Sequence, residues 1–73
     1  MLPQLAKAAR CARKDAGATT AEVAHEANVD PTTVTRFELA SAWPRDPDAM
    51  IAAYARAADR TPKEIWRDAL NDW

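Results

Sequence analysis

The stretch that decides the fold is TTAEVAHEANVDPTTVTRFELA, residues 19–40. Its first part has the spacing of a capping box, in which the side chains of Thr19 and Glu22 each accept a hydrogen bond from the other residue's backbone N–H. A helix is therefore expected over residues 20–27. Small apolar residues recur at helical spacing on its inner face, namely Val23, Ala24 and Ala27.

The second part of the stretch predicts a tight turn and another helix. Asn28 tolerates the left-handed backbone conformation that ends a helix, and Val29 suits the gap between two helices. Asp30 is a favourable N-cap, and Pro31 lacks only an N–H that the first helical position leaves unbonded. A helix is expected over residues 31–39. Its inner stripe would consist of Val34 and Phe37.

Three further helices are expected around this pair. Gly17 is placed to end a helix over residues 3–15 in a left-handed conformation. Asp-Pro at 46–47 starts a helix over 47–58, and the run TPKE at 61–64 combines an N-cap, a first-turn proline and a capping glutamate. No segment alternates in the manner of a strand. The sequence predicts an all-α fold, a compact bundle of about five short helices forming a single domain over residues 1–73.

The expected hydrophobic core is small. Of the 73 residues 48% are hydrophobic, but many are alanine, which favours helix and buries little surface. Cys11 is expected to fill space in this core. The larger core candidates are Leu2, Leu5, Val23, Val29, Val34, Phe37, Met50, Ile51, Tyr54, Ile65, Trp66 and Leu70.

Several functional classes are disfavoured by composition. One cysteine and one histidine, Cys11 and His25, offer neither a disulfide nor a zinc framework. His25 falls on the outer side of its helix, and no catalytic constellation or phosphate loop is visible. We expect no enzyme activity, no cofactor, no metal and no small-molecule ligand. No apolar run of about 20 residues and no signal-peptide pattern are present, so a cytoplasmic protein without membrane contact is expected.

Charge is distributed unevenly along the chain. The net charge of -1 does not by itself favour binding to nucleic acid. Residues 1–14, however, carry four basic side chains and no acidic one, whereas acidic residues outnumber basic ones by six to four from Asp46 onward. This asymmetry is consistent with one face that meets DNA.

The chain resembles the phage repressor/Cro family of helix-turn-helix proteins, also called xenobiotic-response-element-like. RKDAG at 13–17 is similar to the family's basic helix end, and TTAEVA at 19–24 to its Thr-Gln-x-Glu-Leu-Ala opening. VDPTTVTRFE at 29–38 is similar to its recognition element. The resemblance covers most of residues 1–58. It implies a lambda-repressor-like fold whose helices two and three form the helix-turn-helix, and a bacterial or bacteriophage regulator of transcription, such as a repressor, that binds double-stranded DNA.

The sequence departs from the family pattern at three places. Thr20 stands where many members have a glutamine that touches DNA, and Asn28 replaces a turn glycine. Leu39-Ala40 replaces a polar or basic residue followed by glycine, so the loop after the third helix is expected to differ in shape. These departures leave the DNA target open.

The resemblance implies base contacts by Pro31, Thr32 and Arg36 at the start of the recognition helix and one turn later. A guanidinium at Arg36 can bind guanine O6 and N7 together, and a threonine methyl at Thr32 can meet a thymine methyl. A solvated arginine or a salt bridge on an outer helix face is the alternative for Arg36. Arg13 and Glu38 are implied to form a salt bridge between helices one and three.

Contacts with the DNA backbone are expected from a mixed group of side chains. Thr20 sits at a helix N-terminus, where backbone N–H groups favour phosphate, although a plain capping role is also open. Solvent exposure is the alternative for each of the others. The full set is Thr20, Thr33, Thr35, Arg10, Lys14 and Arg45.

The last helix and the loop before 47–58 carry tryptophans. Trp43, followed by Pro44, is expected to anchor that loop on the core, with an interface role as the alternative. Ile65, Trp66, Ala69, Leu70 and Trp73 form one wide apolar stripe. Leu70 and Trp73 are expected to contact a second copy in a homodimer that binds a pseudo-palindromic site. The alternative is that the whole stripe closes the core of the monomer.

Two other functions remain open at this stage. The chain is alternatively a helix-turn-helix module for protein interaction, such as an antirepressor, an antitoxin or a polymerase-binding factor. The acidic composition and the C-terminal tryptophans favour that hypothesis. A third hypothesis is an architectural or excision factor that bends DNA.

Overall fold

The computed structural model describes residues 1–71 of the chain, and the regular secondary structure of this part is helical, without strands. The all-α class is therefore confirmed. Helix three ends one residue earlier than expected and helix one begins one residue earlier. The helices are α1 (Leu2–Asp15), α2 (Thr20–Ala27), α3 (Pro31–Glu38), α4 (Pro47–Ala58) and α5 (Pro62–Asn71).

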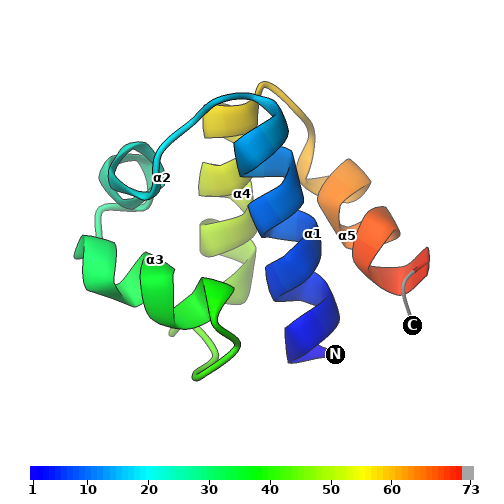
Figure 1. The fold of residues 1–73 in the computed structure, drawn as a ribbon, viewed down its shortest axis with the longest axis horizontal. Coiled ribbons are helices and arrows are strands. Elements are labelled where there is room, and N and C mark those ends of the chain that lie inside the picture. The colour runs from blue at the N-terminus through cyan, green and yellow to red at the C-terminus, as the bar shows by residue number, and fades with distance from the viewer. Residues whose placement is uncertain (72–73) are drawn as a thin grey trace.

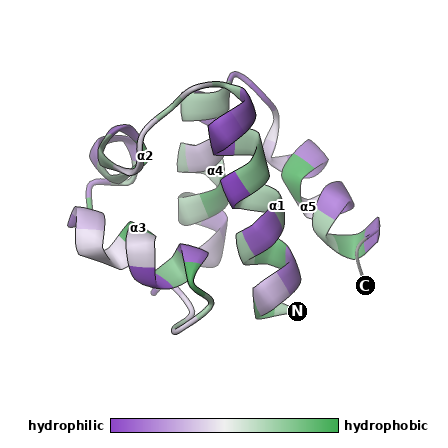
Figure 2. Cartoon of the chain, in the orientation of Figure 1, coloured by the Kyte–Doolittle hydropathy of each residue, from purple (hydrophilic) through white to green (hydrophobic). Residues whose placement is uncertain are grey.

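The helices α1 and α4 pack against each other at the centre of the fold (Figure 1). On one flank α2 packs on α4 and on α3, and α3 also contacts α1. On the other flank α5 packs on α1 and α4. Figure 1 thus places the α2–α3 pair and α5 on opposite sides of the central pair. Hydrophobic residues dominate α4, whereas hydrophilic ones cover much of α2 (Figure 2).

The helix starts that the sequence predicts are confirmed in hydrogen-bonding detail. The hydroxyl of Thr19 accepts from the backbone N–H of Glu22 at 3.1 Å, and the Glu22 carboxylate accepts from the backbone N–H of Thr19 at 3.4 Å. The Asp30 carboxylate accepts from the backbone N–H of Thr32 at 2.8 Å. Each bond satisfies a donor that the helix itself leaves unbonded. Asp46 caps α4, and Thr61 with Glu64 caps α5, in the same manner.

The turns between helices use left-handed residues. Gly17 and Asn28 have φ values of 72° and 56°, as expected. The backbone N–H of Val29 donates to the carbonyl of Ala24 at 3.0 Å and closes the turn between α2 and α3. Ala40, after α3, also has a φ of 56°. The loop after α3 therefore begins in a left-handed conformation that glycine adopts more readily than alanine.

The core is one continuous cluster that joins all five helices. Its large, fully buried side chains come from every helix. They are Tyr54, Phe37, Leu5, Ile51, Ile65, Val23 and Val34.

Four expectations about burial are wrong. Cys11 is exposed, because the buried stripe of α1 passes through Ala9 and Ala12 and leaves position 11 on another side of the helix. Leu70 is 61% exposed because it follows the buried Ala69 by about 100° of helical rotation. Trp43 is 49% exposed, and its neighbour Pro44 is the buried residue of that loop. Val29 is 36% exposed, so it lies at the edge of the turn between α2 and α3 and does not fill the gap between them.

Candidate nucleic-acid interface

The inner side of α3 is held by aromatic and aliphatic packing. Val34 and Phe37 are 0% and 1% exposed. The ring of Phe37 meets the ring of Tyr54 from α4 edge-on, with centroids 5.7 Å apart. Such an edge-to-face pair adds to the stabilisation from burial. This packing fixes the rotation of α3 about its own axis and hence which residues face outward.

A hydrogen-bonded network holds the C-terminal end of α3. The guanidinium of Arg13 binds both carboxylate oxygens of Glu38, with Nε to Oε2 at 2.7 Å and Nη2 to Oε1 at 2.9 Å. This is the pair that the resemblance implies. The hydroxyl of Tyr54 donates to the same Oε2 at 2.6 Å, and Arg13 Nη1 donates to the carbonyl of Ala18 at 3.0 Å. The network therefore ties α3 to α1 and α4 and to the loop before α2.

The network also sets the protonation of its members. Burial by itself would raise the pKa of Glu38, but the hydrogen bonds from Arg13 and Tyr54 and the charges of Arg13 and Arg10 outweigh it. The pKa of Glu38 therefore lies below its ordinary value, and the carboxylate is ionised at neutral pH. Burial and the bond to Glu38 raise the pKa of Tyr54 well above its ordinary value, so its hydroxyl keeps its proton.

The outward side of α3, together with its C-cap residue Leu39, is exposed and unoccupied by other elements. Its exposed residues fall at offsets of 0, 1, 4, 5 and 8, which places them on one stripe of a helix. We call this set the outer stripe of α3. It consists of Pro31, Thr32, Thr35, Arg36 and Leu39. The predicted base-contacting residues Pro31, Thr32 and Arg36 thus lie together on this stripe.

Arg36 supplies the positive charge of the outer stripe. Within residues 1–71 its guanidinium takes no part in a hydrogen bond or an ion pair. Its charge helps to lower the pKa of Asp30, after the larger effects of the hydrogen bonds from the backbone and side chain of Thr32. The donors of Arg36 are therefore available to a ligand.

The threonines of α3 differ in their surroundings. Thr35 is exposed, but its hydroxyl donates to the backbone carbonyl of Pro31 at 3.2 Å. Thr33 is half-buried and lines a groove between α3 and the loop before α4. Thr33 therefore lies off the outer stripe, in the groove that Arg45 also lines, and Thr35 would have to exchange its intrahelical bond to donate to a phosphate.

The remaining predicted cations lie on either side of α3. Arg10 and Lys14 are exposed on α1 and line a groove with Leu39 at the C-terminal end of α3. Arg45 is exposed and lines the groove that Thr33 shares. Thr20 is half-buried as the first residue of α2. Positive charge therefore flanks the outer stripe on both sides.

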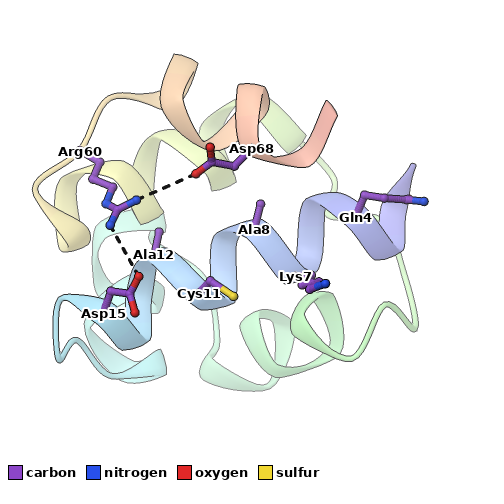
Figure 3. A pocket seen from close by; sticks show the side chains of 8 residues that line it. All are labelled: Gln4, Lys7, Ala8, Cys11, Ala12, Asp15, Arg60 and Asp68. Atoms are coloured by element: carbon purple, nitrogen blue, oxygen red, sulfur yellow. Dashed lines mark ion pairs between the residues drawn. The ribbon is translucent and has the colours of Figure 1, made fainter. Parts of the chain in front are cut away.

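A separate pocket lies between α1 and α5 (Figure 3). Arg60 bridges the two helices here, with its guanidinium 3.7 Å from Asp15 of α1 and 4.0 Å from Asp68 of α5. Cys11 lies at this pocket and also borders the groove beside Leu39. These ion pairs are partly exposed, so they add little to the packing of α5 on α1. No cluster of His, Cys, Asp or Glu in residues 1–71 has an arrangement that would hold a metal ion.

Of the two residues predicted to contact a second copy, Leu70 is exposed beside half-buried Trp66 on α5, and Trp73 lies outside the described residues. Ile65 and Ala69 of the same stripe are buried in the core, so only part of the stripe closes the core of the monomer. No helix in the described part is both long and apolar enough to span a bilayer.

The arrangement as a whole presents one helix, held by its buried face and by Glu38, with an exposed outer stripe that bears Arg36 and with exposed basic residues nearby. Comparison with known proteins adds no assignment, since no family model, curated protein or solved structure matches this chain.

Proposed function

We propose that the chain is a sequence-specific regulator of transcription of the phage repressor/Cro type, which reads the major groove of double-stranded DNA with α3. The observation that carries the proposal is the outer stripe of α3, whose guanidinium at Arg36 has no partner among residues 1–71. An α-helix fits the major groove of B-form DNA, and a side chain must be free to reach base edges there. A transcription regulator of a bacterium or its phage would act in the cytoplasm.

The residues divide into two roles in this proposal. Arg36 would bind a guanine through O6 and N7, and Thr32 and Pro31 would contact neighbouring bases. Phosphates would be bound by Arg10 and Lys14 on one side of α3. On the other side the phosphate contacts would come from Arg45 and from the N-terminus of α2 at Thr20.

A homodimer on a pseudo-palindromic site is part of the proposal. A single copy offers few unpaired cations, and affinity for DNA rises with the number of phosphates neutralised. Two copies would double those contacts and place two α3 helices one helical turn of DNA apart. The exposed side chain of Leu70 on α5 supports a contact between copies on the flank opposite α3.

Selection of bound duplexes from a random pool tests the proposal. Repeated rounds should enrich a common sequence, and binding to it should weaken as salt rises because bound counterions are released. The variant Arg36→Ala should lose preference at one base position while keeping the salt dependence that the phosphate contacts set. Failure to enrich any sequence at low salt and high protein concentration would overturn the proposal.

A protein-interaction module is the second candidate. The observation that favours it is the exposure of large apolar side chains, with Leu39 at 70%, Trp43 at 49% and Leu70 at 61%. Apolar side chains that form one large contiguous patch commonly mark a contact with another protein. The same selection separates the two candidates, because an interaction module of this kind would bind no duplex preferentially.

A further inference from the structure

Resting on the proposed function, we infer that the outer stripe of α3 reads thymine methyl groups on either side of a single guanine. The DNA half-site would therefore contain one guanine contacted by Arg36, with thymines next to it whose C5-methyl groups meet Pro31, Thr35 and Leu39. This assigns a chemical class to the DNA target, which the sequence leaves open.

The first observation concerns the groups that Thr35 can offer to a base. A threonine on a recognition helix has two groups to offer, a hydroxyl and a methyl. The hydroxyl proton of Thr35 is already donated to the carbonyl of Pro31 at 3.2 Å, one helical turn earlier. While Thr35 keeps this bond, it has no hydroxyl proton for a base acceptor or a phosphate, and its methyl group is the part that distinguishes it from serine.

The other members of the outer stripe point to the same chemistry. Pro31 is exposed and carries only an aliphatic ring, and Leu39 is 70% exposed with no polar atom in its side chain. Thr32 is exposed and offers both a hydroxyl and a methyl group. Among the five residues, Arg36 is thus the strong donor, and three offer apolar groups without a free hydroxyl proton.

The major groove offers one apolar group to such a surface. The base edges there present nitrogen and oxygen acceptors and amino donors, and only the C5-methyl of thymine is apolar. Covering a polar base edge with an aliphatic side chain removes its water without replacing the hydrogen bonds. A stripe with one guanidinium and three apolar groups is therefore complementary to thymines around a guanine.

The cations beside the stripe favour DNA as its occupant over an apolar protein surface. Arg10 and Lys14 flank its C-terminal end, and Arg45 lies on the other side of α3. These cations are placed beside the apolar groups, where the two phosphate backbones bordering a groove would lie. An apolar protein surface would leave them without partners.

Uracil substitution tests the inference on a duplex obtained by selection. Each thymine is replaced in turn by uracil, which keeps the Watson–Crick pairing and removes only the C5-methyl. Two or three positions per half-site should each lose about fourfold in affinity, which corresponds to one methyl group at ~0.8 kcal/mol. Substitution elsewhere in the duplex should have no effect.

Two matched variants assign one of these positions to Thr35. Thr35→Val keeps the methyl and lacks the hydroxyl, whereas Thr35→Ser keeps the hydroxyl and lacks the methyl; the three residues have similar helix propensities. The loss caused by uracil at one position should persist in Thr35→Val and disappear in Thr35→Ser. Thermal melting of each variant checks that the fold is retained.

The outcomes separate this inference from the proposed function. A selected site that binds equally well with uracil, or whose recognition needs the hydroxyl at position 35, overturns the inference and leaves DNA binding in place. A selected site without thymine beside guanine also overturns it. If selection yields no site, both the proposed function and the inference are wrong.

Discussion

The hydroxyl of Tyr54 donates a hydrogen bond to the carboxylate of Glu38 over 2.6 Å, and this bond joins α4 to the last residue of α3. The same oxygen of Glu38 accepts from Arg13 on α1. Tyr54 itself is fully buried. The position of the proposed recognition helix thus depends on a tyrosine that lies on another helix and has no access to DNA.

Tyr54→Phe is expected to lower the free energy of unfolding by about 1.5–3 kcal/mol, the usual contribution of a hydrogen bond to a charged group. The phenylalanine ring keeps the edge-on contact with Phe37. Urea denaturation measures the change. A double-mutant cycle with Glu38→Gln should show that the two substitutions are not additive, because they remove the same bond. Additive effects would mean that Tyr54 stabilises the fold only by packing.

The stability of the protein is expected to depend on pH through Glu38. Its pKa is lowered in the folded state from the ordinary value of 4.5, so its ionised form stabilises the fold above that value. This contribution is lost as the pH falls from 4.5 through the lower pKa of the folded state. The stability difference between wild type and Glu38→Gln should therefore be constant near neutral pH and shrink below 4.5.

A control for the pH experiment comes from another ion pair. Glu26 binds Arg56 at 2.9 Å, but the two side chains are 42% and 54% exposed. An exposed pair contributes little because water and salt screen it. Glu26→Gln should therefore change stability at neutral pH by less than about 1 kcal/mol. A loss as large as that of Glu38→Gln would show that burial is not what distinguishes the two carboxylates.

The helix boundaries were predictable from sequence because caps are local. Thr19 and Asp30 bond to residues two or three positions away, so their residue types alone indicate the helix starts. Burial was less predictable, because on these short helices one residue of rotation moves a side chain from the core to the surface. That rotation explains the wrong expectations for Cys11 and Leu70. The expectation that Trp43 packs on the core was wrong for another reason, since a loop has no periodicity from which burial can be inferred.

In the candidate site, too, the features set by local sequence were predictable and those set by packing were less so. Buried Val34 and Phe37 fix the rotation of α3, so the sequence pattern was enough to place Thr32 and Arg36 outward. The Arg13–Glu38 pair was implied by resemblance rather than by spacing, since its members are 25 residues apart. The bond from Tyr54 to Glu38 and the bond from Thr35 to Pro31 were missed. Each depends on packing or on a side-chain rotamer that residue order does not specify.

Arg36→Ala is expected to separate recognition from folding. Arg36 is exposed and makes no hydrogen bond within residues 1–71, so stability should change by less than about 0.5 kcal/mol. Discrimination at one base position should fall by about 1–3 kcal/mol. Arg67→Ala is the matched control, because Arg67 is an exposed arginine on α5, on the opposite flank. A loss of stability in Arg36→Ala as large as that in Glu38→Ala would show that Arg36 belongs to the fold.

Ala40→Gly is expected to stabilise the protein by about 0.5–1 kcal/mol. Ala40 has a φ of 56°, a left-handed conformation that a Cβ disfavours and that glycine adopts without strain. The gain is reduced by the greater freedom of glycine in the unfolded chain. Ala42→Gly is the control, since Ala42 lies in the same loop without a positive φ and the substitution should destabilise. Equal effects of the two substitutions on the melting temperature would contradict this account.

Leu70→Lys is expected to weaken self-association without unfolding the monomer. Leu70 is 61% exposed, whereas Ile65 and Ala69 on the same helix are buried, so replacing Leu70 removes little from the core. If α5 forms a two-fold contact, two lysines would face each other there and be repelled. Sedimentation should show a dimer for wild type and for the apolar control Leu70→Met, and a monomer for Leu70→Lys. Affinity for a two-fold DNA site should fall in the lysine variant, because each copy would bind its half-site alone.

A wild-type protein that stays monomeric at high concentration and binds DNA one copy at a time would remove the dimer from the proposal. The proposed reading of each half-site by α3 would be unaffected by that result, because it depends on a single copy.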